Sequence, residues 1–109
     1  MRISKTNAYW HVCEFGIPEE DESVSTITAD TLFRYVKNDQ ANEIIKESGG
    51  MEIEICRRAI IRWRKFVDSD GTEIEWSKEN FEEAISHPMI AAEWVRQWAR
   101  SLTQVAKKN

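Results

Sequence analysis

One stretch decides how this chain is expected to fold. Residues 51–67 have the sequence MEIEICRRAIIRWRKFV. Its apolar residues recur at the three- and four-residue spacing of a single helix face, which comprises Cys56, Ala59, Ile60, Trp63 and Val67. Because an amphipathic helix buries its apolar face, this face is expected to point into the core. We therefore predict a helix over 51–67.

The opposite side of this predicted helix is basic. It carries Arg57, Arg58, Arg62, Arg64 and Lys65, and Ile61 lies among these charges. One interpretation is an ordinary solvated face. The other is a partner surface, with Ile61 as an apolar anchor inside a rim of arginines. Trp10 and Trp76 are either lids on the core or exposed contacts, and Trp is common at interface hot spots. The predicted partner-binding residues are Arg57, Arg58, Ile61, Arg62, Lys65 and Trp76.

The first half of the chain has the pattern of two strands. Residues 8–16 are rich in aromatic and branched side chains and end at Gly16, and residues 24–36 alternate between two faces. We predict that they pair as an antiparallel hairpin; a helix over 31–47 is the rival interpretation. A short helix over 39–48 follows, begun by Asn38 or Asp39 and ended by Gly49 and Gly50.

The second half continues with an exposed polar connection over 68–75 around Gly71. Ser77 is placed to cap a helix over 77–86, and Pro88 is placed to begin a helix over 88–106. The predicted fold class is α+β: an N-terminal antiparallel β-hairpin followed by about four helices in a small, mainly helical bundle. The 109 residues suffice for one hydrophobic core, so residues 1–109 are expected to form a single domain.

Composition and charge narrow the classes of function. The hydrophobic content of 41% is typical of globular proteins, and the net charge of −4 disfavours broad binding to nucleic-acid phosphates. No stretch approaches the ~20 apolar residues of a membrane span, and the N-terminus lacks the apolar run of a signal peptide. A cytoplasmic protein that does not enter membranes is therefore expected, with Cys13 and Cys56 as buried thiols.

The candidate chemical motifs are incomplete. His11 and Cys13 could form half of a metal site, but His87 stands alone and no second ligand pair follows. The stretch 68–79 has Glu73 at the sixth position, where a calcium loop needs glycine. The sequence contains no nucleophile elbow and no phosphate loop. We therefore predict a protein that is not an enzyme and has no catalytic residue, metal or cofactor.

The order of features over 59–85, AIIRWRKFVDSDGTEIEWSKENFEEAI, resembles the tail assembly chaperones of long-tailed phages and prophages. That family shows an aliphatic helix ending in Gly-Trp, an acidic glycine turn, an aromatic-Ser-x-Glu-Asn motif, a short helix and a final amphipathic helix. The resemblance extends upstream to a Trp-initiated strand and a second strand ending at 33–36. This chain departs from the pattern in having Arg62 in place of Gly, Trp76 in place of Phe or Tyr, and no Pro before Trp76.

The resemblance implies a function without chemistry. Such a protein is needed to build the virion but is absent from it, works in the host bacterial cytoplasm, binds the tape measure protein and helps to recruit tail tube subunits; self-association is left open. The alternative is a small nucleic-acid-associated regulator that uses a basic helix over 57–65, and the net acidity disfavours it. A small enzyme would need a concave pocket with strongly shifted pKa values, which nothing in the sequence requires.

Overall fold

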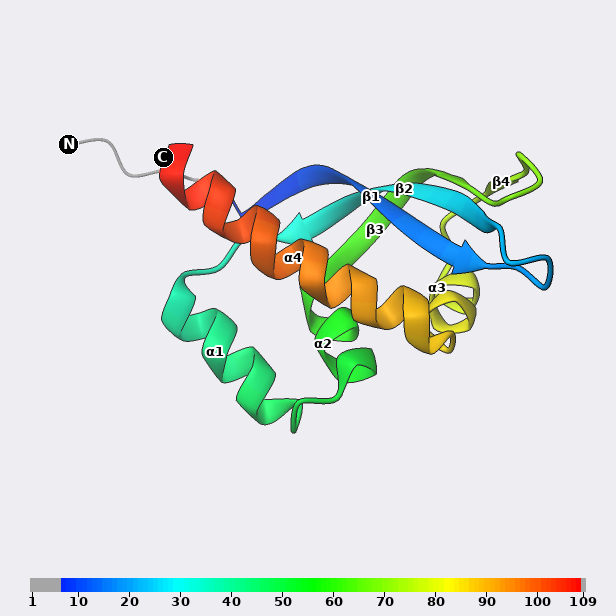
Figure 1. Ribbon diagram of the computed structural model, residues 1–109. Helices are drawn as coiled ribbons and strands as arrows, with labels where there is room; N and C mark the ends of the chain where they lie inside the picture. The colour runs from blue at the N-terminus through cyan, green and yellow to red at the C-terminus, as the bar shows by residue number, and fades with distance from the viewer. Residues whose placement is uncertain (1–6, 109) are drawn as a thin grey trace.

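A computed structural model describes the backbone of residues 7–108 and the side chains of residues 7–105. Four antiparallel strands form one sheet in the order β1-β2-β3-β4, and α2, α3 and α4 lie against one of its faces (Figure 1). The α+β class is therefore confirmed. The elements are β1 Ala8–Pro18, β2 Val24–Arg34, α1 Asn38–Glu47, α2 Glu52–Ala59, β3 Ile60–Val67, β4 Glu73–Ile74, α3 Lys78–Ile85 and α4 Pro88–Lys108.

The first two strands follow the alternation in the sequence. β1 pairs with β2 over their whole lengths, and Cys13 lies opposite Ala29 with both side chains buried. Val12, next to Cys13, is 59% exposed, as expected when successive strand residues face opposite sides of a sheet. The predicted strands over 8–16 and 24–36 and the helix over 39–48 are confirmed within a few residues. The rival helix over 31–47 is wrong in its first part, because residues up to Arg34 belong to β2.

The helix predicted over 51–67 is wrong in its second half. Helix α2 ends at Ala59, and Ile60 already has the extended angles φ −101° and ψ 126°. The chain then continues as β3, which pairs with β2. The fold is therefore a four-stranded sheet covered by helices, and the expected hairpin with a mainly helical bundle is corrected.

Two β-bulges explain why β3 has the spacing of a helix in the sequence. Ile60 pairs with Phe33 and Arg62 with Leu32, so Ile61 is an extra residue; a second extra residue lies between Arg64 and Val67. Each bulge lengthens the strand by one residue without a partner. As a result Ile60, Trp63 and Phe66 are all buried, at intervals of three residues in place of two.

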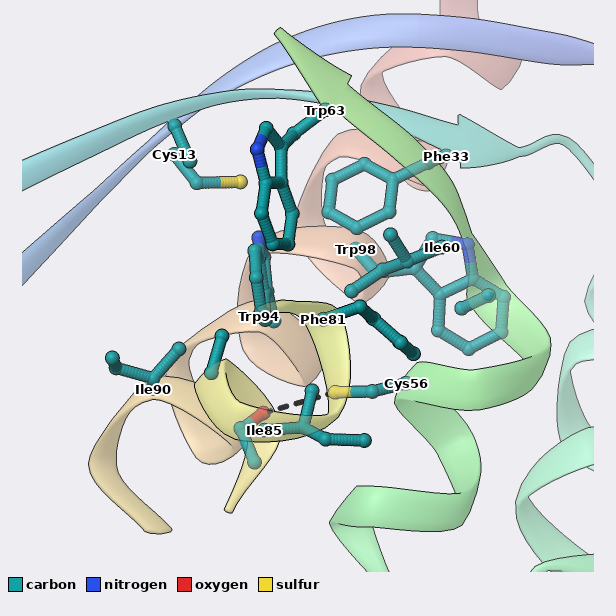
Figure 2. Close-up of a cluster of buried hydrophobic side chains, with 14 of the residues drawn as sticks. Cys13, Phe33, Cys56, Ile60, Trp63, Phe81, Ile85, Ile90, Trp94 and Trp98 are labelled. Carbon is teal, nitrogen blue, oxygen red and sulfur yellow. Dashed lines mark hydrogen bonds between the residues drawn. The ribbon is translucent and has the colours of Figure 1, made fainter. Parts of the chain in front are cut away.

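The core is built around Trp94 of α4 (Figure 2). Its ring packs edge-on against Phe15 at 5.3 Å between centroids and stacks with Trp63 at 5.9 Å. Its indole N–H donates a 3.0 Å hydrogen bond to the Thr31 hydroxyl. The Cys56 thiol donates to the carbonyl of Ala91 at 3.5 Å, drawn as a dashed line in Figure 2. Cys13 and Cys56 are both buried and free, as predicted.

The last two helices begin where the sequence placed them. The Ser77 hydroxyl accepts a 2.9 Å hydrogen bond from the Asn80 backbone N–H, so it caps α3, and Pro88 begins α4. The connection over 68–75 is not wholly irregular, because Glu73 and Ile74 form β4 beside β3. In the described part of the chain, no helix is both long and apolar enough to cross a membrane.

Candidate interaction surface on the open face of the sheet

Within residues 7–108, one face of the sheet carries no helix, and we call it the open face (Figure 1). Strand alternation and the register of β1, β2 and β3 place the following side chains, among others, on it: Trp10, Val12, Glu14, Thr28, Asp30, Leu32, Arg62 and Arg64. An antiparallel sheet commonly has one solvated face, and such a face is usually polar. Here Trp10 and Val12 of the edge strand β1 and Leu32 of β2 add apolar character to the open face.

Trp10 lies at the centre of a cationic cluster on the open face. The guanidinium carbon of Arg64 is 3.9 Å from the centroid of the indole ring, and that of Arg62 is 5.5 Å away. Both distances lie within the range of cation–π attraction. Arg64 also donates a 2.6 Å hydrogen bond to the Asp30 carboxylate opposite it on β2. The side chain of Arg64 is thus held from two sides, whereas Arg62 forms no ion pair with another described residue.

Arg57 and Arg58, both predicted to bind a partner, instead connect helices of this chain. Arg57 pairs with Glu54 of α2 and, at 2.6 Å, with Glu82 of α3. The hydrogen bond from Arg57 holds the pKa of the Glu82 carboxyl below its ordinary value. Arg58 pairs with Glu47 of α1 at 2.5 Å. These arginines therefore link α2 to its neighbours along the chain and in space.

The other predicted residues are dispersed. Ile61 lies at the first β-bulge, and Lys65 lies at the second with a φ of 52°. Trp76 is 36% exposed and packs edge-on against Trp63 at 4.9 Å, so it covers one end of the core. The basic helix over 57–65 on which the nucleic-acid alternative depends is not formed, because α2 ends at Ala59.

Of the six predicted residues, Arg62 alone belongs to the open face, and the sequence reasoning left out Val12, Leu32 and Arg64 as contact residues. The alternation over 8–16 could have placed Trp10 and Val12 on one face. No local signal could have placed the arginines beside Trp10, because their position depends on the pairing of β3 with β2.

The residues considered as metal ligands or nucleophiles lie apart or are buried. Among residues 7–105, no group of three or more His, Cys, Asp or Glu side chains is arranged to hold a metal ion. The His11 Nε2 atom is 3.1 Å from the Gln97 amide oxygen on α4. Burial raises the pKa values of Cys13 and Cys56 to about 12, which keeps both thiols protonated and poorly nucleophilic near neutral pH.

Comparison with known proteins adds no assignment, because no family model, curated protein or solved structure matches this chain.

Proposed function

We propose that this chain is a non-enzymatic tail assembly chaperone of a long-tailed phage or prophage. It acts in the host cytoplasm, binds the tape measure protein, helps to recruit tail tube subunits during virion assembly and is left out of the mature particle. The observation that carries the proposal is the ordered series of Trp63, the turn at Gly71, Trp76, Ser77 and Asn80.

These residues form one corner of the molecule, between β3 and α3. The Trp63 indole N–H donates a 2.9 Å hydrogen bond to the carbonyl of Ile74 in β4. Trp76 packs against Trp63 and Phe81, and Ser77 caps the helix that follows. The Asn80 side-chain amide donates to the Glu75 carbonyl at 2.9 Å. The resemblance thus rests on residues that build one corner of the fold, and the open face is a separate surface.

The open face supports the binding role. A chaperone that covers apolar client segments and then releases them needs accessible apolar area of moderate affinity. Val12, 59% exposed, lies in register with Asp30, and Trp10 lies in register with Leu32 on the adjacent strand. These side chains offer a shallow apolar surface beside the positive charge of Arg62, which suits reversible binding.

Co-expression with the tape measure protein tests the proposal. We expect this chain to raise the soluble fraction of the tape measure protein and to copurify with it. The Val12→Asp substitution should lower both quantities, because it places a charge among the apolar side chains of the open face. The matched control is Met51→Asp, since Met51 is also apolar and is 60% exposed but lies at the start of α2, away from the open face.

Two outcomes would contradict the proposal. The tape measure protein could remain equally insoluble with and without this chain, which would remove the chaperone function. The gene could also lack a major tail protein gene upstream and a very long tape measure gene downstream. If Val12→Asp and Met51→Asp behaved alike while the wild-type chain retained activity, the open face would be the wrong surface.

A further inference from the structure

A pocket lies at the corner between the sheet and the start of α4, on the helix-covered side. Its volume is about 370 Å³, within the ~300–1,000 Å³ range of ligand sites in proteins. We call it the corner pocket. Its apolar lining is Ile27, Trp63, Phe66, Ile74, Ala84 and Ile90, and its polar lining is Asp68, Asn80, Glu83 and His87. These residues come from β2, β3, β4, α3, α4 and their connections, so the pocket depends on how α3 and α4 pack against the sheet.

The surroundings of the corner pocket are strongly acidic. The β1–β2 turn, the β3–β4 connection and α3 all lie at the same end of the molecule (Figure 1). Together with β4 and the connection that follows it, they hold more than half of the 19 acidic residues: Glu19, Glu20, Asp21, Glu22, Asp68, Asp70, Glu73, Glu75, Glu79, Glu82 and Glu83. Lys78 is the basic residue on the same segments. This end therefore attracts cations over a distance that depends on salt.

We propose that the corner pocket binds one bulky apolar side chain of a partner segment whose flanking residues are Lys or Arg. The apolar lining supplies the site for the anchor, and the carboxylates of Asp68 and Glu83 at the polar side of the pocket face its basic neighbours. Glu83 is suited to this role because its side chain is 78% exposed. The inference rests on the proposed function in one respect, which is that the tape measure protein is the expected source of such a segment.

Peptide titrations into the intact ¹⁵N-labelled chain test the pocket directly. The first probe is a synthetic helical peptide with one leucine in a background of lysine, alanine and glutamine. The second probe replaces each lysine with glutamate, and the third replaces the leucine with alanine. We expect the first probe to shift the amide resonances of Ile74, Ala84 and Ile90. The second should not bind, and the third should bind on the order of tenfold more weakly.

Two variants distinguish the pocket from general attraction to an acidic protein. Ala84→Leu fills the pocket and should weaken the first probe on the order of tenfold. Glu83→Lys reverses one charge at its rim and should weaken the probe roughly fivefold. The matched control is Glu43→Lys on the exposed surface of α1, which should leave affinity nearly unchanged. If the Ala84→Leu chain fails to fold, the affinities of the Glu83→Lys and Glu43→Lys chains for the first probe decide whether the pocket binds it.

The proposal is overturned if the three peptides bind equally, if the shifts fall on the open face, or if Glu83→Lys and Glu43→Lys have equal effects. Its failure can be told apart from failure of the chaperone function. If the tape measure protein binds the wild-type, Ala84→Leu and Glu83→Lys chains equally well, the proposed role of the corner pocket fails. The chaperone function then still stands. If the peptides bind specifically at the corner pocket but the tape measure protein does not bind at all, the pocket stands and the chaperone function fails.

Discussion

The indole N–H of Trp94 donates a 3.0 Å hydrogen bond to the hydroxyl of Thr31, and both side chains are fully buried. This bond joins α4 to the middle of β2. The Thr31 hydroxyl in turn donates a hydrogen bond to the carbonyl of Ala29 at 3.1 Å. It therefore accepts one hydrogen bond, from Trp94, and donates another. A polar pair at this depth is stabilising only while both members are present, because a buried donor without an acceptor loses its hydration without compensation.

Thr31→Val should therefore lower the free energy of unfolding by about 1–3 kcal/mol, although valine has nearly the same shape as threonine. Urea unfolding followed by circular dichroism measures the change. Thr26→Val is the matched control, because Thr26 is exposed on the same strand and should change stability by less than about 0.5 kcal/mol. Equal effects of the two substitutions would show that the Trp94 bond does not contribute.

Lys65 has a φ of 52°, which is unfavourable for a residue with a Cβ atom. Lys65→Gly should raise the free energy of unfolding by up to about 1 kcal/mol, because glycine adopts this conformation without steric cost. If residues 60–67 were helical, the same substitution would lower it by about 1 kcal/mol. Glu43→Gly in the middle of α1 provides the comparison and should be destabilising. The sign of the Lys65→Gly effect thus tests the strand itself.

Burial raises the pKa values of Cys13 and Cys56 from 9.0 to about 12. Between pH 9 and 12 the unfolded chain releases these thiol protons while the folded chain keeps them. Stability should therefore fall as the pH rises through this range, by up to about 1.4 kcal/mol per pH unit for each thiol. The contribution is fully present below pH 9, where both states are protonated.

Urea midpoints at pH 8, 10 and 11 measure this decline. The control is the double variant Cys13→Ala, Cys56→Ala, which should lose less stability over the same range because it has no thiols to titrate. Burial also raises the pKa of Tyr9 to about 12, and this contribution remains in the control. An identical decline in both chains would contradict the assignment. In the native wild-type chain at pH 8, a thiol reagent should react with neither cysteine until the protein unfolds.

Ser77 caps α3 through the hydrogen bond that its hydroxyl accepts from Asn80. Ser77→Ala should lower the free energy of unfolding by about 1 kcal/mol, and Ser77→Asp should retain most of the stability because a carboxylate caps equally well. Thermal unfolding distinguishes the two variants. Ser69→Ala in the exposed connection before β4 is the control and should be neutral. A neutral Ser77→Ala would mean that the cap does not hold this corner.

Local sequence patterns predicted an element correctly wherever only one backbone conformation fits the pattern. The alternation over 8–16 and 24–36 indicated two strands, because only an extended chain places Cys13 and Phe15 on one side with Val12 on the other. Ser77 and Pro88 indicated where two helices begin, because capping and the missing proline N–H act within one turn. Burial of both cysteines followed from the same patterns.

The candidate surface could be predicted only in part. The pattern over 8–16 contains the information that Trp10 and Val12 share a face. That face is uncovered, and Arg62 and Arg64 lie over the ring of Trp10 only because β3 pairs with β2. The basic residues were assigned to one helix by their spacing, whereas the structure divides them between α2 and β3.

What the sequence by itself determined is the α+β class, the first two strands, the helix starts and the burial of both cysteines. What only the tertiary structure decided is the conformation of residues 60–67. Ile60, Trp63 and Phe66 would be buried by a helix, and they are also buried by a strand with two bulges, so the apolar pattern does not distinguish the two. Pairing with β2 resolves the choice, because the backbone N–H and C=O groups along the edge of β2 need partners, and β3 supplies them from 27 to 39 residues further along the chain.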